Sequence, residues 1–411
     1  MKRRPVVLFL IAALALARAS HAQDRLMVEG ELGAFGRFGQ VIGPGIPNLG
    51  GTILVGGGRY AVWSQNNLSY DLRSGSSALQ LPPGRLVAGD AARPFVYMAR
   101  PGGVWRIHAG TGAEQQVDAG GDSGLRNCVV ASSSAELYCA FARSLMLDDI
   151  VRITPGGREL VASTWILSGF SLGGAPPPAE LVATSDGAFL YAMRCDAPLP
   201  NAPQFCLRTS VWRVDTRSGA QTAIEATGQM QWDELNERLF LHSGQNVRVL
   251  TKDLADLGSA FVGGRCHTLA VSPHTGRLYL HRMDYYYGPA WSTLAAFDSA
   301  TYQRVEADVE RRTGSTCDPM VLLTAPGPPR NLKASVSGHV VSLAWENVGG
   351  ASSFVLEAGA TPGSAAVTMS LGADSRLTVP DVPSGTYYLR LRGGNEFGGG
   401  RSSPELRVVV P

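Results

Sequence analysis

The sequence predicts an all-β protein, and three observations support this fold class. The 411 residues include 49 glycines and 25 prolines but only 17% charged residues, a composition typical of turn-rich chains. Apolar and polar residues alternate in short runs, which is the period of a strand with one buried face. Related runs recur at steps of 36 to 53 residues. We therefore expect many short antiparallel strands arranged as repeats.

The first 22 residues predict a secretory signal peptide that is cleaved after Ala22. A basic start at residues 2–4 precedes the apolar run Val6–Ala17, and Ser20-His21-Ala22 supplies the small residues of a cleavage site. The run is too short to span a bilayer, and no later stretch reaches the roughly 18 apolar residues of a spanning helix. We expect a soluble mature chain that is secreted or periplasmic, with an uncleaved anchor as the alternative.

The charge balance and motifs give no indication of nucleic acid, metal or cofactor binding. Without residues 1–22 the chain carries 32 Lys and Arg against 34 Asp and Glu, so nothing attracts nucleic acid or anionic lipid. The remaining six histidines are scattered, without metal-binding spacing. Calcium loops, nucleophile elbows and phosphate-binding glycine loops are also missing from the sequence. We expect no cofactor, no metal and a monomer.

Six copies of one sequence pattern predict the blades of a β-propeller. In each copy an apolar strand after a polar turn is followed by a second strand of the form Val-x-Arg-Ile, then by a turn and a short last strand. Taking Tyr60, Val96, Leu137, Leu190, Leu239 and Leu278 as equivalent gives steps of 36, 41, 53, 49 and 39 residues. Repeats of about 40 to 50 residues with four short strands are typical of propeller blades. The second-strand copies are Val104–Ile107, Ile150–Ile153, Val211–Val214 and Asn246–Val249, with looser copies at Leu68–Asp71 and Ala295–Asp298.

A seventh blade is predicted from the two ends of the repeat region. Cys317–Leu323 has the pattern of one more innermost strand, and residues 24–48 could supply its outer strands. Joining both ends would close the ring and remove exposed sheet edges. We therefore expect a six- or seven-bladed propeller over residues 23–324. Its repeats resemble those of the YVTN/quinoprotein-like class of seven-bladed propellers.

After a Pro-rich linker at residues 325–330, the pattern changes to that of a second domain over residues 331–411. Leu343-Ala344-Trp345 places a core Trp on an early strand, and Tyr387 opens a strand that ends in the turn Asn395-Glu396-Phe397-Gly398. These residues resemble a fibronectin type III domain, a β-sandwich in which Tyr387 would be the tyrosine-corner residue. The resemblance implies a spacer or docking module.

Cysteine positions suggest three disulfides among 15 formal pairings. Cys128 and Cys139 flank a predicted turn at residues 132–135, and Cys195 and Cys206 flank a Pro-rich loop in the same way. Cys266 and Cys317 remain, each at the beginning of a predicted strand. The alternative, six free buried thiols, fits an exported protein less well.

Loop lengths predict which face of the ring binds a ligand. Connections between first and second strands, and between third and fourth strands, are short, whereas the long ones fall on the other face. The long connections are residues 144–149, 164–180, 196–205, 284–291 and 311–316. Long loops on a rigid scaffold are common binding sites. The three predicted disulfides also fall on this face and would brace it.

The candidate ligand-binding residues lie in and beside these loops. Three tyrosines and a Trp offer flat amphipathic surfaces for a glycan or a protein, and five polar residues flank the cysteines of inner strands. These residues are Tyr285, Tyr286, Tyr287, Trp291, Arg126, Asn127, Arg265, His267 and Asp318. The aromatic rings could instead pack the loop onto its blade, and the polar residues could secure loops between blades. The leading hypothesis is an exported, non-catalytic binding protein.

An enzyme is the rival hypothesis, since propeller enzymes take their acid and base from different blades. Asp318, His267 and Tyr286 could form such a set in a hydrolase or lyase acting on an extracellular carbohydrate or lactone. Fold alone does not decide between the two functions.

Overall fold

A computed structural model describes residues 25–28, 52–64, 66–72, 79–144, 147–165, 181–199, 202–243, 246–261, 266–284, 291–312 and 320–411. Every regular element in these ranges is a β-strand. Within them no helix has the length and apolar character to cross a membrane. The expectation of an all-β protein is confirmed.

Six four-stranded antiparallel sheets make up the propeller, each formed by four consecutive strands. The first three sheets contain β2 (Thr52–Val55), β3 (Tyr60–Trp63), β4 (Leu68–Asp71), β5 (Leu79–Gln80); β6 (Arg85–Gly89), β7 (Phe95–Arg100), β8 (Gly103–His108), β9 (Glu114–Asp118); and β10 (Leu125–Val130), β11 (Leu137–Ala142), β12 (Leu147–Thr154), β13 (Gly157–Trp165). The next three contain β14 (Leu181–Ala183), β15 (Phe189–Leu199), β16 (Ala202–Asp215), β17 (Gln221–Glu225); β18 (Gln229–Asp233), β19 (Arg238–Ser243), β20 (Asn246–Thr251), β21 (Asp256–Phe261); and β22 (Cys266–Val271), β23 (Arg277–Asp284), β24 (Trp291–Asp298), β25 (Arg304–Arg312). Each copy of the repeated sequence pattern therefore corresponds to one four-stranded sheet.

The two ends of the repeat region pair with each other. Strand β1 (Arg25–Val28) runs antiparallel to β26 (Met320–Leu323), with Arg25 opposite Leu323. The first strands of consecutive sheets contact one another in sequence order from β2 to β22, and β22 contacts β26. The described part of the seventh sheet is thus two-stranded, and it joins residues from before the first blade to residues after the sixth.

The repeated residues build the core between blades. Tyr138, Tyr191 and Tyr279, on the second strands of their sheets, are at most 1% exposed. In the Val-x-Arg-Ile strands most apolar positions are buried, and two of the four arginines, Arg106 and Arg213, lie over the rings of Phe95 and Phe189. Arg106 lies 4.7 Å from the ring centre of Phe95, a cation–π contact. The repeated sequence pattern thus specifies both the buried apolar face of the strand and the polar side chains at its edge.

The C-terminal residues form a sandwich of two sheets with fibronectin type III strand order. One sheet has the order β27-β28-β31, and the other has the order β30-β29-β32-β33, with β34 also on β32. The strands are β27 (Arg330–Ser337), β28 (Val340–Glu346), β29 (Ser353–Gly359), β30 (Val367–Leu371), β31 (Arg376–Val379), β32 (Gly385–Asn395), β33 (Gly398–Ser402) and β34 (Leu406–Val410). Trp345 packs in the core, 5.3 Å from Phe354 between ring centres. Tyr387 donates its hydroxyl proton to the Pro383 carbonyl at 2.9 Å, which confirms the predicted tyrosine corner.

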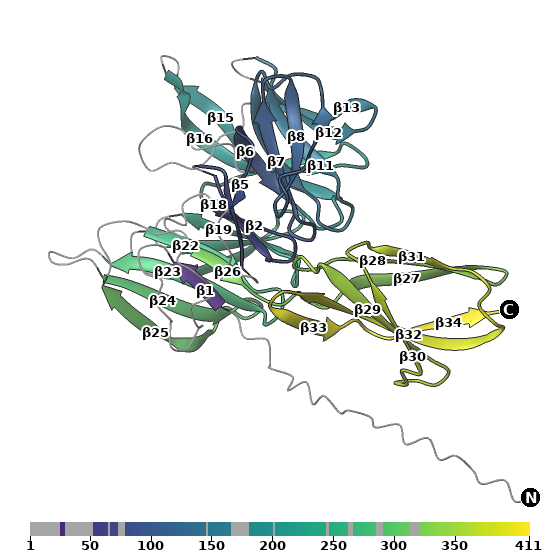
Figure 1. The fold of residues 1–411 in the computed structure, drawn as a ribbon. Helices are drawn as coiled ribbons and strands as arrows, with labels where there is room; N and C mark the ends of the chain where they lie inside the picture. The colour runs from purple at the N-terminus through teal and green to yellow at the C-terminus, as the bar shows by residue number, and fades with distance from the viewer. Residues whose placement is uncertain are drawn as a thin grey trace, which may run out of the picture.

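The sandwich is docked on one face of the ring, which we call the short-turn face because it carries the turns between first and second strands. Turns of five of the six four-stranded sheets contact the sandwich. Glu396 N donates to Gly57 O at 3.3 Å, and Asn347 N donates to Ser133 Oγ at 2.6 Å. Arg330 donates to Glu234 O at 2.7 Å. Ala91 and Pro273 lie against Gly350 and Gly349. In Figure 1 the sandwich projects from the ring, with the C-terminus at its far end.

The Pro-rich stretch between ring and sandwich is packed. Ala325, Pro326, Gly327 and Pro329 are all buried, and Gly327 N donates to Val348 O at 3.0 Å. Asn395 Nδ2 also donates to Thr324 O at 2.8 Å. Its composition predicts a linker, but its contacts fix the ring and the sandwich together.

Candidate functional site

The aromatic loop that the sequence singles out falls largely outside the described residues. Five candidate residues lie outside the described ranges, namely Tyr285, Tyr286, Tyr287, Arg265 and Asp318. Trp291 is described at the start of β24, where its backbone pairs with Asp284 and Arg312.

Two of the candidate residues lie at the same end of one sheet. His267 on β22 is opposite Arg282 on β23, which is opposite Thr293 on β24. Trp291 is two positions from Thr293 on the same strand. The backbone therefore brings His267 and Trp291 to the end of the sheet opposite the short-turn face, which we call the long-loop face.

Arg126 and Asn127, at the start of β10, are engaged within the protein. Arg126 Nε contacts Asp148 Oδ1 at 3.1 Å, and the Asp148 side chain is fully buried. Arg85 on the preceding blade donates to the carbonyls of Leu125 and Arg126 at 2.8 and 2.9 Å. Asn127 also has an interaction within the chain. The Arg126 side chain thus bonds within its own blade, whereas the Arg85 bonds to the two carbonyls join adjacent blades.

Two of the predicted disulfides are present. Cys128 bonds to Cys139, and Cys195 bonds to Cys206, with S–S distances of 2.04 and 2.09 Å. Cys317 lies outside the described residues, so its pairing with Cys266 stays a prediction. Two disulfides are typical of proteins in oxidising compartments.

The positions of these bonds differ from the expectation that they brace loops. Cys128 and Cys139 are directly opposite each other within β10 and β11 and are 4% and 0% exposed. They lie in the core between blades. The predicted loop at residues 196–205 is mostly strand, because β15 continues to Leu199 and β16 begins at Ala202. The pairing tolerates Pro198 because the register shifts on either side of it.

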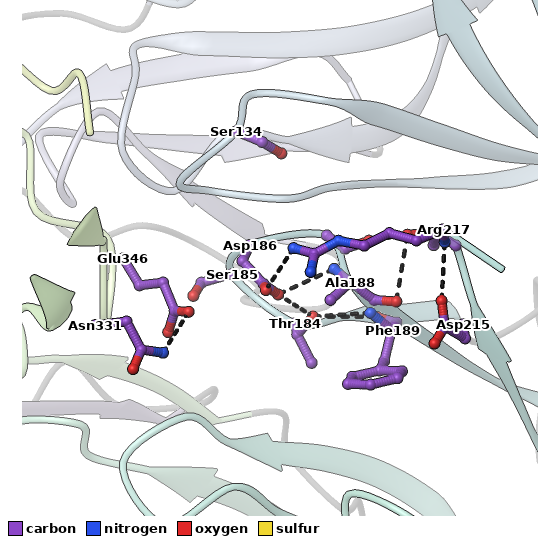
Figure 2. Close-up of polar contacts among 12 residues, drawn as sticks. Ser134, Thr184, Ser185, Asp186, Ala188, Phe189, Asp215, Arg217, Asn331 and Glu346 are labelled. Atoms are coloured by element: carbon purple, nitrogen blue, oxygen red, sulfur yellow. Dashed lines mark hydrogen bonds and ion pairs between the residues drawn. The ribbon is translucent and has the colours of Figure 1, made fainter. Parts of the chain in front are cut away.

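A polar cleft of about 610 Å³ lies between the sandwich and the ring. One wall comes from turns of the second, third and fourth blades, and the other from β27, β28 and the segment before β31. Figure 2 shows part of it, with Arg217 directed toward Asp186 and the Asn331–Glu346 pair on the sandwich side. The lining residues are Arg93, Ser133, Ser134, Glu136, Asp186, Arg217, Asn331, Lys333, Ala344, Trp345, Glu346, Asp374, Ser375 and Arg376. No pattern in the sequence indicates this cleft, because its walls are distant in sequence.

The carboxylates of the cleft are held by protein donors. Glu136 accepts from Arg152 at 3.0 Å, and Asp186 forms an ion pair with Arg217 at 3.5 Å. Glu346 accepts from Asn331 Nδ2 at 2.6 Å. Asp374 lies 3.7 Å from Arg93. Each of the four acidic residues therefore has a partner within the protein, but the partner of Glu346 is a neutral amide and the Asp374 side chain is 87% exposed.

Glu234, at the junction of the ring and the sandwich, has an unusual electrostatic environment. Its carboxylate accepts from Ser185 Oγ at 2.5 Å and from the indole N–H of Trp232. Burial raises the pKa of Glu234 to about 7, and nearby Glu346 adds to the shift. No group of three or more His, Cys, Asp or Glu residues suited to a metal ion occurs within the described ranges.

No protein-family model and no curated protein matches the sequence. Among solved structures, the chain is similar to the extracellular domain of a hybrid two-component system from B. thetaiotaomicron, with 11% identity and a TM-score of 0.40 over 88% of this chain. The match spans 50% of that domain. A chain of the mitotic checkpoint complex matches with 13% identity and a TM-score of 0.47 over 85% of this chain and 99% of its own length. An Fn3-like protein from Clostridium thermocellum matches 21% of this chain and 96% of its own, with 23% identity and a TM-score of 0.20. At these values the matches carry no inference about function.

Proposed function

We propose that the protein is an exported, non-catalytic binding protein whose long-loop face holds a glycan or a protein. The observation that carries this proposal is the position of the sandwich. It occupies the short-turn face through contacts with five blades, so the long-loop face is the side of the ring left for a large ligand. The sandwich then acts as a fixed base rather than as a loose spacer.

The composition of the long-loop face supports the same assignment. Tyr285, Tyr286, Tyr287 and Trp291 are consecutive or close in sequence, and the position of Trp291 at the same end of the sheet as His267 supports a shared surface. Aromatic side chains with a polar edge are enriched at glycan and protein interfaces. The hairpin of β15 and β16, held by Cys195–Cys206, adds a second projecting element from the fourth blade.

The test is a binding screen against glycans and surface proteins, followed by a double substitution. We expect Tyr285→Ala with Trp291→Ala to abolish binding of any ligand found, while the melting temperature stays unchanged. The matched control is Leu160→Ala with Leu257→Ala, which removes two apolar side chains that are 62% and 46% exposed on outer strands. A screen without ligands, or a double variant that binds as well as the control, would contradict the proposal.

A further inference from the structure

One edge strand of the sandwich has a partner on one side only. Among the described strands β30 pairs with β29 alone, so it ends its sheet. The outer side of an edge strand presents backbone N–H and C=O groups to which a further strand can bind. In Figure 1, β30 lies at the border of the sandwich away from the blades. All of its residues are exposed or half-buried, so its open edge is accessible.

Two apolar side chains of β30 belong to the core face of the sheet but are exposed. Met369 lies opposite Leu356 and Val367 opposite Ala358, and Leu356 is a core residue that is 6% exposed. Residues opposite each other on paired strands share one face of the sheet. Val367 and Met369 are nevertheless 58% and 38% exposed. They line an apolar pocket of about 410 Å³ between the two sheets, so the core is uncovered beside β30.

Strand β30 also lacks the charged residues that the other edge strands carry. The sequence has no charged side chain between Glu357 and Asp374. Charged side chains on an edge strand oppose its pairing with a second strand. Two copies of β30 can therefore meet without repulsion between like charges. The other edge strands of the sandwich are β27 with Arg330 and Lys333, β31 with Arg376, β33 with Arg401 and β34 with Arg407.

The residue types of β30 are the same in both directions along the strand. Val367, Met369 and Leu371 are apolar, and they alternate with the hydroxyl residues Thr368 and Ser370. Antiparallel pairing of two copies centred on Met369 aligns the whole strand. Val367 of one copy then lies opposite Leu371 of the other, Thr368 lies opposite Ser370, and the two Met369 residues lie opposite each other. Apolar pairs and hydroxyl pairs across strands both stabilise a sheet.

We propose that β30 is an interface for a second copy of this chain, which adds its own β30 antiparallel to the first. A twofold interface joins one surface to itself, as the symmetric pattern of β30 allows. An axis perpendicular to the sheet keeps both core faces on one side, so Val367 and Met369 of the two copies pack together. The interface is small, which places the dimer in the transient class. It does not involve the long-loop face and is independent of the proposed function.

Sedimentation equilibrium of residues 23–411 tests the proposal. We expect a monomer–dimer equilibrium with a dissociation constant between about 1 µM and 1 mM, and no larger species because a twofold interface is closed. Met369→Lys places two cations opposite each other and should weaken the dimer at least about tenfold. The matched control, Val409→Lys, adds the same charge to a residue that is 53% exposed on β34, at the opposite edge of the same sheet. It should leave the dissociation constant within about twofold.

Exchange of charge between two variants tests the twofold register. Met369→Glu alone should weaken the dimer as Met369→Lys does, whereas an equimolar mixture of the two should restore it, because opposite charges then face each other. Restoration also shows that both variants are folded. A chain that stays monomeric up to about 1 mM, a dimer that Met369→Lys leaves intact, or a mixture that fails to associate would overturn the proposal. The first of these outcomes is the monomer expected from the sequence.

Discussion

Replacing Arg330 is the most direct way to weaken the docking of the sandwich on the ring. Arg330 lies at the start of β27, and its guanidinium donates to Glu234 O at 2.7 Å and to Glu237 Oε1 at 2.9 Å. Arg330→Ala removes both bonds. Neither the core of the sandwich nor the core of the ring contains this side chain.

The free-energy cost of Arg330→Ala follows from how exposed Arg330 and the residues that it contacts are. The ion pair is partly exposed, with 27% and 37% exposed side chains, so it contributes about 0.5 to 1 kcal/mol. The Glu234 carbonyl left without its donor adds about 1 to 2 kcal/mol. A total of about 2 kcal/mol makes undocking roughly 30-fold more frequent.

Amide hydrogen exchange at Asn347 measures this change. Its N–H donates across the interface to Ser133 Oγ at 2.6 Å, so exchange requires the sandwich to move away from the ring. We expect roughly 30-fold faster exchange in Arg330→Ala, and no change at Leu391, which is bonded within the sandwich. Arg407→Ala is the control. Equal rates at Asn347 in wild type and variant would refute the reasoning.

Three further predictions concern stability. Since the pKa of Glu234 is raised to about 7, from 4.5, the folded protein binds the proton more tightly, so stability falls as pH rises from about 4.5 to 7. Glu234→Gln should flatten this part of the pH profile in urea unfolding, and an unchanged slope would count against the assignment. Replacing Cys128 and Cys139 by Ala should lower the free energy of unfolding by about 3 kcal/mol in denaturant titrations, since the bond closes a loop with a sequence separation of 11; a loss below 1 kcal/mol would be inconsistent with this. Gly58→Ala should lower the melting temperature by several degrees, because its φ is +80° and a Cβ there would meet the Phe397 ring; an unaltered melting curve would show that the contact is absent.

The repeats were predictable because each one encodes a complete local pattern. The apolar positions around Tyr138 and Tyr191 recur with strand period, and a separation of 11 residues around a turn placed Cys128 opposite Cys139. The Trp345 and Tyr387 motifs similarly carry local geometry, so the sandwich was predicted correctly.

The arrangement of the ring and the sandwich could not be predicted. Asn347 and Ser133 are 214 residues apart, and the contact between them is made by turns, which have no periodic pattern. Pro198 suggested a loop because proline breaks regular pairing, but register shifts accommodate it within the hairpin. Arg126 was a candidate ligand-binding residue from its place beside Cys128, whereas its partner Asp148 is identifiable only in three dimensions.

The docked sandwich is the central claim, because it assigns the short-turn face to the base and the long-loop face to the ligand. Double electron–electron resonance between spin labels at Leu160 on the ring and Val336 on the sandwich tests this claim directly. Both positions are exposed, at 62% and 36%. A fixed interface predicts one narrow distance distribution that broadens in Arg330→Ala. A broad distribution in the wild-type protein, unaffected by that substitution, would show a tethered sandwich and contradict the account.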